Sequence, residues 1–236
     1  AVPSQSPAAP GAELVGVVRN VFGDPVPGAT VRIGDKFTRS DSAGRYILSP
    51  VAPGPHTLEV SAPGYRSIEL NVWLDEGSNS PNISNETGLW PKGFMGDFHV
   101  FYNKGLDGEL KLFGVVGFAN GSDEEYFVHD AYVLGPDGGL YQDLLESVDD
   151  YRELAGTYTD SNYTSSPAMA VIVYPRTVIR KDLEPSSAGT DSQVRSGEYR
   201  LIIVGAGQEG HRTGAYERVV LTARPYLDVD WDPHYP

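Results

Sequence analysis

The alternation of short apolar runs with turn residues, centred on residues 16–65, constrains the fold more than any other feature of the sequence. The apolar runs cover residues 15–18, 29–33, 46–48, 57–60 and 68–73, and Gly, Pro and Asp lie between them. Short strands with turn signals about every 8–12 residues are typical of a β-sandwich. Apolar residues also alternate at period two, as in Val31/Ile33 and Leu58/Val60, which predicts that each strand buries one face.

The residues between these runs have the chemistry of tight turns. Gly28 and Gly44 lie where a chain reversal favours a positive φ angle, and Asp24 and Asp41 can hydrogen-bond their own downstream backbone. Proline has a fixed φ and no N–H group, so the prolines of this stretch are expected outside strand interiors. These prolines are Pro25, Pro27, Pro53 and Pro63.

The turn residues also form an ordered series of motifs. A glycine-led strand at 16–18 precedes Pro27-Gly28-Ala29-Thr30-Val31, Gly44-Arg45-Tyr46, Pro53-Gly54 and Ala62-Pro63-Gly64-Tyr65. Over about residues 13–75, this series resembles the carboxypeptidase regulatory-like domain, a small transthyretin-like sandwich. The resemblance implies an accessory module of the kind that is often attached to secreted enzymes, receptors and surface proteins. It supplies no catalytic residue.

Residues 94–224 are also predicted to be mostly strands. Candidate strands lie at 97–102, 109–118, 126–134, 168–174, 198–205 and 215–224. One short helix is predicted at 143–155, where Leu144, Val148, Tyr151 and Leu154 recur every three or four residues. The expected fold is therefore all-β, with a small transthyretin-like sandwich followed by a larger sandwich that carries one short helix.

Composition shifts mark the remaining boundaries. Residues 1–12 are rich in Pro, Ala and Ser and are predicted to form an extended arm. Residues 76–93 are polar, with Gly and Pro, and are predicted to link the two domains. Residues 225–236 form an aromatic C-terminal tail that is expected to dock on protein rather than to extend into water.

The net charge and the absence of cysteine limit which cellular compartments and which classes of partner are expected. The chain carries 32 acidic and 18 basic residues and no cysteine. An acidic surface repels phosphate backbones, so nucleic acid is not an expected partner, and disulfide or thiolate chemistry is absent. The start at Ala1 predicts an exported protein whose signal peptide has been cleaved, and the lack of a long apolar run predicts no membrane span. The absence of cysteine from an exported protein of this size favours a prokaryotic source.

Four N-x-[ST] triplets are candidate glycosylation sites. They are centred on Asn82, Asn85, Asn120 and Asn162. One interpretation is surface glycosylation of an exported glycoprotein, and the other is chance in loops rich in Ser and Thr. The sequence leaves both interpretations open.

The sequence shows no convincing catalytic constellation, and we expect no enzyme activity and no cofactor. The five histidines lack metal-ligand spacing, and His129-Asp130 is more readily explained as packed or surface residues than as a hydrolytic dyad or an iron site. Residues 205–210 fit G-x-G-x-x-G, but we expect a glycine-rich hairpin loop there, with no helix to receive a phosphate. Asp228, Asp230 and Asp232 alternate along the chain and are candidate calcium ligands, although exposed surface carboxylates explain them as well.

Several runs of the second domain are apolar at consecutive positions, as in residues 110–118, 168–174 and 201–204. Such strands are buried on both faces. Two explanations fit: a neighbouring subunit covers them, or they are central strands beneath the helix and long loops of the same chain.

These features lead to two functional hypotheses. The first is a non-enzymatic exported subunit of an extracellular filament, fibre or surface layer, which binds copies of itself through terminal arms and apolar strand faces. The second is a carbohydrate- or surface-binding accessory module of a secreted enzyme or adhesin. The candidate partner-binding residues are Trp90, Tyr226, Trp231 and Tyr235.

Overall fold

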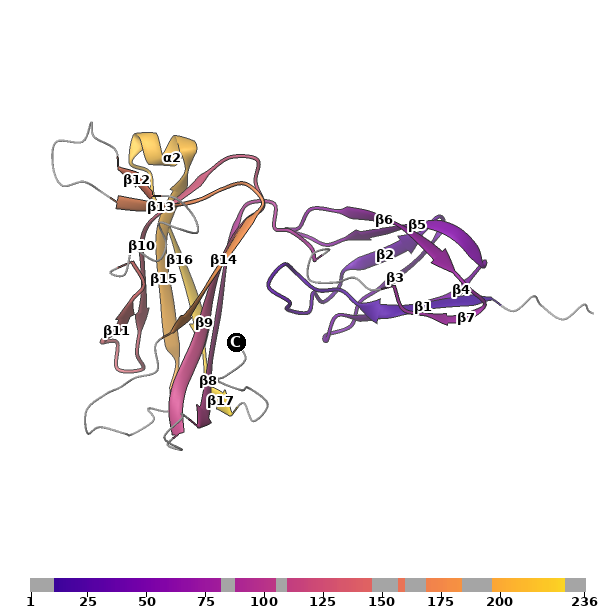
Figure 1. Cartoon of the computed structure of the whole chain (residues 1–236), viewed down its shortest axis with the longest axis horizontal. Coiled ribbons are helices and arrows are strands. Elements are labelled where there is room, and N and C mark those ends of the chain that lie inside the picture. The colour runs from indigo at the N-terminus through magenta and orange to yellow at the C-terminus, as the bar shows by residue number, and fades with distance from the viewer. Residues whose placement is uncertain are drawn as a thin grey trace, which may run out of the picture. The chain divides into compact units, whose positions relative to one another are not determined.

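The computed structural model describes residues 11–81, 88–104, 110–145, 157–159, 169–183 and 197–227 (Figure 1). The chain divides into two compact units, Ala1–Lys92 and Gly93–Pro236. Strands dominate both units, which confirms the predicted all-β fold. No helix in the described ranges is long and apolar enough to cross a membrane.

The first unit is a sandwich of two sheets. The smaller sheet has the order β4-β1-β7, from Arg45–Val51, Ala12–Val17 and Gly77–Asn79. The larger sheet has the order β3-β2-β5-β6, from Lys36–Arg39, Thr30–Ile33, Gly54–Ser61 and Ile68–Leu74. All pairs are antiparallel except β1 with β7, which run parallel.

The predicted alternation fills the core between these two sheets. Leu14 and Leu48 from the smaller sheet pack with Val31, Leu58 and Val60 from the larger one, and all five are buried. The intervening residues on β5 and β6 point to solvent. The period-two pattern therefore predicted correctly which face of each strand is buried.

The turns agree with their sequence chemistry at Gly28, Gly44 and Asp41. Gly28 and Gly44 have φ angles of 70° and 73°, as predicted. The Asp41 side chain accepts the N–H groups of Ala43 at 2.9 Å and Arg45 at 2.8 Å. In the turn before Pro25 the acceptor is Asn20, whose Oδ1 receives the N–H groups of Phe22 and Asp24, each at 2.9 Å.

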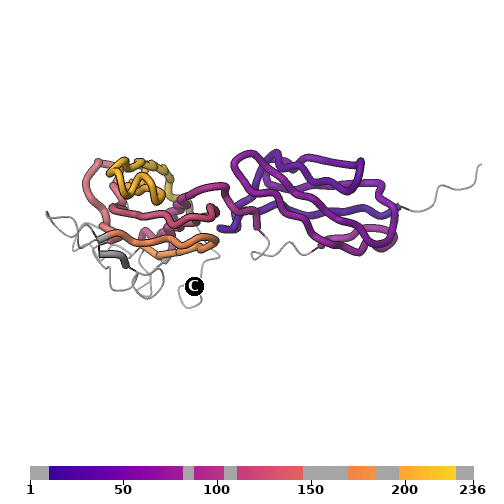
Figure 2. The backbone as a smooth tube through the Cα atoms, turned by 90° about the horizontal axis from the view of Figure 1, so that it is seen from above, coloured from indigo at the N-terminus to yellow at the C-terminus, as the bar shows by residue number. Residues whose placement is uncertain are grey.

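The second unit is a larger sandwich, also of two sheets (Figure 2). One sheet has the order β14-β9-β8-β17, from Thr177–Leu183, Leu110–Asn120, Phe94–Lys104 and Tyr226–Leu227. The other has the order β12-β13-β10-β15-β16, from Thr157–Thr159, Met169–Val173, Tyr126–Leu134, Tyr199–Gly207 and Glu217–Ala223. A further strand, β11 (Leu140–Asp143), pairs with β10 outside this path.

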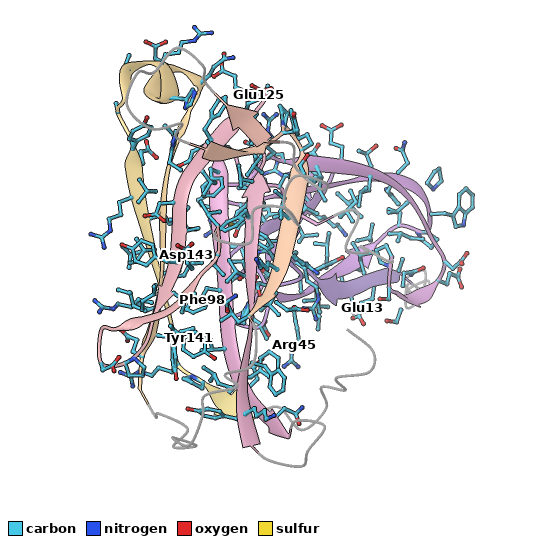
Figure 3. All side chains as sticks on the ribbon, turned by 60° about the vertical axis from the view of Figure 1, so that its left-hand side comes forward. Glu13, Arg45, Phe98, Glu125, Tyr141 and Asp143 are labelled. Atoms are coloured by element: carbon cyan, nitrogen blue, oxygen red, sulfur yellow. The ribbon has the colours of Figure 1, made fainter. Side chains whose placement is uncertain are left out.

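Side chains from both sheets form the core of the second unit. Phe98 of β8 and Phe118 of β9 pack with Val128 of β10 and Leu201 of β15 (Figure 3). Tyr141 of β11 meets the ring of Tyr199 edge-on, with the centroids 5.6 Å apart. All six strands predicted for this domain are present, with ends shifted by a few residues.

The linker prediction needs correction, and most of the predicted helix lies outside the described residues. The described helix is α2 (Gln208–Thr213), whereas residues 146–155 of the predicted helix lie outside the described residues. The predicted linker 76–93 contains β7, and Leu89 is buried in the first core. The polar composition of residues 76–93 gave no sign of a strand, because β7 pairs with β1 mainly through backbone hydrogen bonds.

The doubly apolar strands are covered within a single copy of the chain. On the side of the β10 sheet that faces away from the main core, Phe127, Ala170 and Ile172 form a separate buried cluster. Phe101 and Phe113, neighbours on β8 and β9, are buried as well and stack with their centroids 6.0 Å apart. A neighbouring subunit is therefore not needed to explain the apolar runs.

Candidate functional site

The outer face of β5 and β6 in the first unit presents an exposed tryptophan. Trp73 is 69% exposed, although it lies inside a strand of a well-packed sheet. The inward residues of β6 are Ile68, Leu70 and Val72, so alternation sends Trp73 outward. The sequence contained this signal, because the parity of the strand already placed residue 73 on the solvent side.

The strand pairing places two polar side chains next to this ring. Trp73 lies opposite Pro55 on β5, and the next outward pair is Thr57 opposite Asn71. We call Pro55, Thr57, Asn71 and Trp73 the Trp73 face. The face borders a shallow, open depression of about 430 Å³, which His56 and Val72 also line.

Hydrogen bonds orient the groups of the Trp73 face. The Trp73 indole N–H donates to Oδ1 of Asp75 at 3.3 Å, which restrains the rotation of the ring. The Thr57 hydroxyl donates to Oδ1 of Asn71 at 3.5 Å. The amide of Asn71 therefore presents its NH₂ group as a donor beside the indole surface.

Charged residues continue the same sheet face beyond the Trp73 face. Glu59 on β5 lies opposite Glu69 on β6 and, on its other side, opposite Arg32 on β2. The Arg32 guanidinium also lies 5.8 Å from the ring centroid of Phe37, an exposed residue on β3. This side of the sheet thus combines a flat aromatic surface with hydrogen-bond donors and acceptors and with charged groups of both signs. Such a combination can bind a ligand rich in hydroxyl groups.

A second cluster lies on the β10 sheet of the second unit. Nε2 of His129, on β10, is 2.9 Å from Nδ1 of His211, on α2. The His211 ring stacks on Phe127 with the centroids 4.0 Å apart, and the Tyr216 ring lies 4.3 Å from that of His129. Sequence reasoning missed this pair because 82 positions separate the two histidines.

The strand β10 contains a β-bulge at His129. In the ladder between β10 and β15, Val128 pairs with Gly205 and Asp130 with Val204, so His129 is an extra residue. Val128 and Ala131 both face the core, although they are three positions apart. His129 and Asp130 therefore both lie outside the core. Bulges often redirect side chains in this way next to functional sites.

Electrostatics of this cluster favour neutral side chains. Burial, and secondly the neighbouring His211, lower the pKa of His129. Burial, and secondly Asp143 at the end of β11 (Figure 3), raise the pKa of Asp130, while a hydrogen bond from the Ala131 backbone acts in the opposite direction. The distance of 2.9 Å is that of an N–H···N hydrogen bond, in which one imidazole donates to the facing nitrogen of the other.

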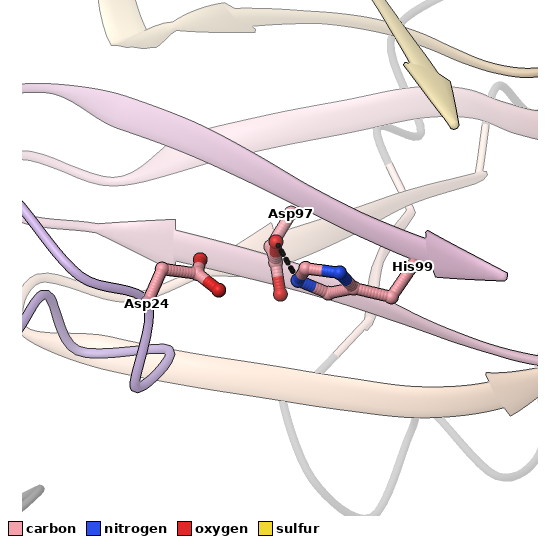
Figure 4. A group of neighbouring side chains, drawn as sticks. All are labelled: Asp24, Asp97 and His99. Carbon is pink, nitrogen blue, oxygen red and sulfur yellow. Dashed lines mark ion pairs between the residues drawn. The ribbon is translucent and has the colours of Figure 1, made fainter. Parts of the chain in front are cut away.

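One further histidine has a carboxylate partner. His99 and Asp97, both on β8, form an ion pair with Nε2 3.0 Å from Oδ1 (Figure 4). The two residues are separated by one position and so lie on the same side of the strand. The pair orients the imidazole on the outer side of β8.

The predicted partner-binding residues have different outcomes. Tyr226 is 51% exposed on β17, with its ring 6.0 Å from that of Phe101. Trp90 is partly buried, and its carbonyl accepts the N–H of Arg66 at 2.8 Å. Trp231, Tyr235 and the calcium candidates Asp228, Asp230 and Asp232 lie outside the described residues.

Among the glycosylation candidates, Asn120 has a structural role. It is fully buried, and its Nδ2 donates to the carbonyls of Glu124 at 2.7 Å and Val173 at 2.8 Å. Its Oδ1 accepts the hydroxyl of Ser122 at 2.7 Å. In the folded domain this nitrogen is therefore engaged and inaccessible to a glycan. Asn82, Asn85 and Asn162 lie outside the described residues, and their glycosylation stays a prediction.

The glycine-rich stretch at 205–210 differs from the expected loop. It leads into α2, which joins β15 to β16 and ends at Gly214 with a φ angle of 74°. Close packing explains two of its glycines. A Cβ atom on Gly205 would lie 2.6 Å from the Phe127 carbonyl oxygen, and one on Gly210 would lie 2.6 Å from that of Ala215. Steric fit, rather than phosphate binding, accounts for this pattern.

Comparison with known families identifies the first unit. The carboxypeptidase regulatory-like domain model matches residues 13–84. The first sandwich is a carboxypeptidase regulatory-like domain. This confirms the resemblance found in the sequence and extends it through β7. The match covers under a third of the chain and lies within the first unit. No curated protein matches the chain.

Solved structures show distant likenesses. A chain of the type II cohesin–X-dockerin complex from Acetivibrio cellulolyticus is 22% identical, with a TM-score of 0.29, over 35% of this chain and 59% of that one. A candidate carbohydrate-binding protein from Bacteroides uniformis is 12% identical, with a TM-score of 0.32, over 92% and 100%. BcpA, the major pilin subunit of Bacillus cereus, is 7% identical, with a TM-score of 0.32, over 91% and 69%. Likenesses of this extent carry no argument about function.

Proposed function

We propose that the chain is a non-enzymatic, carbohydrate-binding module of an exported or cell-surface protein, and that it binds glycans on the Trp73 face. The observation that supports this most directly is the exposed indole of Trp73, restrained by Asp75 and flanked by Thr57 and Asn71. An accessory domain attached to a secreted or surface protein is the setting that the carboxypeptidase regulatory-like domain implies.

The physical chemistry of sugar binding matches this face. A pyranose ring has an apolar side of C–H groups, which stacks on an aromatic ring, and a rim of hydroxyls, which need donors and acceptors. An indole that the fold already holds in place loses little conformational freedom when a ligand binds. The depression is open rather than enclosed, so it suits one stretch of a longer polysaccharide better than a small, fully enclosed ligand.

The test is a glycan array followed by titration of the bound glycans against the full chain. We expect Trp73→Ala to weaken binding at least about tenfold, or about 1.4 kcal/mol, because it removes the stacking surface. Quenching or enhancement of tryptophan fluorescence by the bound glycan provides a second readout. Tyr226→Ala is the matched control, since it removes another exposed aromatic ring on the second unit.

Two outcomes would contradict the proposal. One is the absence of binding to any glycan on the array, and the other is unchanged binding by the Trp73→Ala variant. Loss of binding on replacing Trp90 or Trp231, with Trp73→Ala unaffected, would move the glycan site to one of the residues predicted from the sequence.

Self-assembly into a filament or surface layer stays a prediction. Its sequence support came from the terminal arms and the doubly apolar strands. Residues 1–10 lie outside the described residues, and the apolar strand faces are already buried within one copy of the chain. The Trp73 face is therefore the better-supported basis for a function.

A further inference from the structure

We propose that His129 and His211 form a binding site for one divalent transition-metal ion, with Cu²⁺ bound more tightly than Zn²⁺ or Ni²⁺. The site lies on the second unit, at the junction of β10 and α2. It is independent of the Trp73 face and does not depend on glycan binding.

The separation of the two nitrogens is the first argument. Imidazole nitrogens bind zinc at about 2.0–2.1 Å, and Cu²⁺ bonds are similar in length. With these bond lengths, two ligands at right angles around a square-planar or tetragonal ion have nitrogens about 2.9 Å apart, whereas tetrahedral ligands have them about 3.3 Å apart. The observed 2.9 Å between Nε2 of His129 and Nδ1 of His211 matches the first geometry.

The second argument is that the fold holds both rings in place before any ion binds. Alternation along β10 places His129 on the same side of the sheet as Phe127, and α2 positions His211 over that side. Phe127 stacks on His211, with the two planes 10° apart, and Tyr216 packs against His129. Two rings that the fold already brings together lose less conformational freedom on binding an ion than two unrestrained side chains would.

The hydrogen bond between the two rings also leaves a route to coordination. In the ion-free protein one ring donates an N–H to the other, so only one of the two facing nitrogens carries a proton. Coordination requires the donor ring to move that proton to its other nitrogen, a change of tautomer with no net loss of a proton. The ion then binds to one side of the line between the two nitrogens, and each ring rotates about its Cβ–Cγ bond until its nitrogen points at the ion.

The ligand set determines which ions bind. Imidazole nitrogens suit Cu²⁺, Ni²⁺ and Zn²⁺, whereas Ca²⁺ and Mg²⁺ prefer oxygen ligands. Among the described residues, no third His, Asp or Glu joins the two histidines as a ligand. Both histidines are partly exposed, so water can occupy the other positions of the ion. Tetragonal geometry and the general order of divalent-ion affinities both favour Cu²⁺.

The test uses the full chain, freed of metal with EDTA and titrated with CuCl₂ in a non-coordinating buffer at neutral pH. We expect one Cu²⁺ per chain and an electron paramagnetic resonance spectrum of a tetragonal site with nitrogen ligands. His129→Gln and His211→Gln should each weaken Cu²⁺ binding at least about tenfold. His56→Gln, a histidine substitution on the first unit, should leave it unchanged, and CaCl₂ should not compete.

Melting temperatures in EDTA check that each variant is folded. A second measurement on the wild-type chain requires no variant: sub-stoichiometric Cu²⁺ should broaden the NMR signals of residues 129 and 211 before those of His56 and His99. The proposal is overturned if the chain binds no Cu²⁺ or if both glutamine variants bind it as the wild type does. Broadening centred on other residues would also overturn it.

Discussion

At the scale of single residues, buried polar groups carry information that the sequence pattern conceals. Asn120 appears in a glycosylation triplet, yet its amide connects β9 to the turn at Glu124 and to the end of β13. The motif names only residue types, whereas the role of Asn120 depends on two carbonyls from other segments. In contrast, parity along β6 was enough to place Trp73 in solvent, because that property is local.

Tyr46 yields a prediction about alkaline pH. Its hydroxyl is buried in the first core and, among the described residues, has no hydrogen-bond partner. Burial raises the pKa of Tyr46 from 10.0 to about 12. Because the folded pKa is the higher one, the neutral phenol's contribution to stability is complete below about pH 10 and is lost as the pH rises through about 12.

We therefore expect Tyr46→Phe to reduce the loss of stability between neutral pH and about pH 11. At neutral pH the variant should be as stable as the wild type or more stable by up to about 1 kcal/mol, because the lost hydroxyl had no partner. Urea unfolding at both pH values measures this, and phenolate absorbance reports the titration. A variant that is markedly less stable at neutral pH would show that the hydroxyl is bonded after all.

At the scale of elements, periodicity predicted most strands, while short or irregular ones required the structure. β7 and β14 are held by backbone pairing to strands distant in sequence, and the short β3 is held by its hairpin with β2. In the sequence, the bulge at His129 is visible only as a spacing of three positions between the core residues Val128 and Ala131. Its approach to His211 depends on α2, which a glycine-rich sequence does not predict.

The turns of the first sandwich allow a matched test of two glycines. Gly28 and Gly44 have nearly the same φ, but a Cβ atom on Gly44 would lie 2.6 Å from the Val18 carbonyl oxygen. A Cβ atom on Gly28 would have no heavy atom within 4 Å. The turn at Gly44 therefore requires both the positive φ and the absence of a side chain.

We expect Gly28→Ala to lower the free energy of unfolding by about 1 kcal/mol, the cost of a left-handed alanine. Gly44→Ala should lower it by more than about 2 kcal/mol, because backbone must also move away from the new methyl group. Urea denaturation of both variants, followed by circular dichroism, measures the difference. Equal losses would mean that the Val18 carbonyl gives way at little cost.

At the scale of the whole molecule, the two candidate sites belong to separate compact units. The Trp73 face lies on the carboxypeptidase regulatory-like domain, and the histidine pair lies on the larger sandwich. Each site is assembled from elements of its own unit, so each activity is testable by substitutions that leave the other intact. Family resemblance identified the first unit from local turn motifs, while the second has no such motifs and is defined by long-range strand pairing.

The state of association follows from where the apolar surface lies. The strand faces that first indicated a polymer are buried within one chain, at Phe127 and Ile172 on one sheet and at Phe113 on the other. Burying them again against a neighbour would gain nothing from the hydrophobic effect, which scales with the area removed from water. We therefore expect sedimentation velocity to show a single species with the mass of one chain at micromolar concentration. Concentration-dependent growth that disappears when residues 1–10 are deleted would contradict this and restore the filament hypothesis, with the N-terminal arm as its contact.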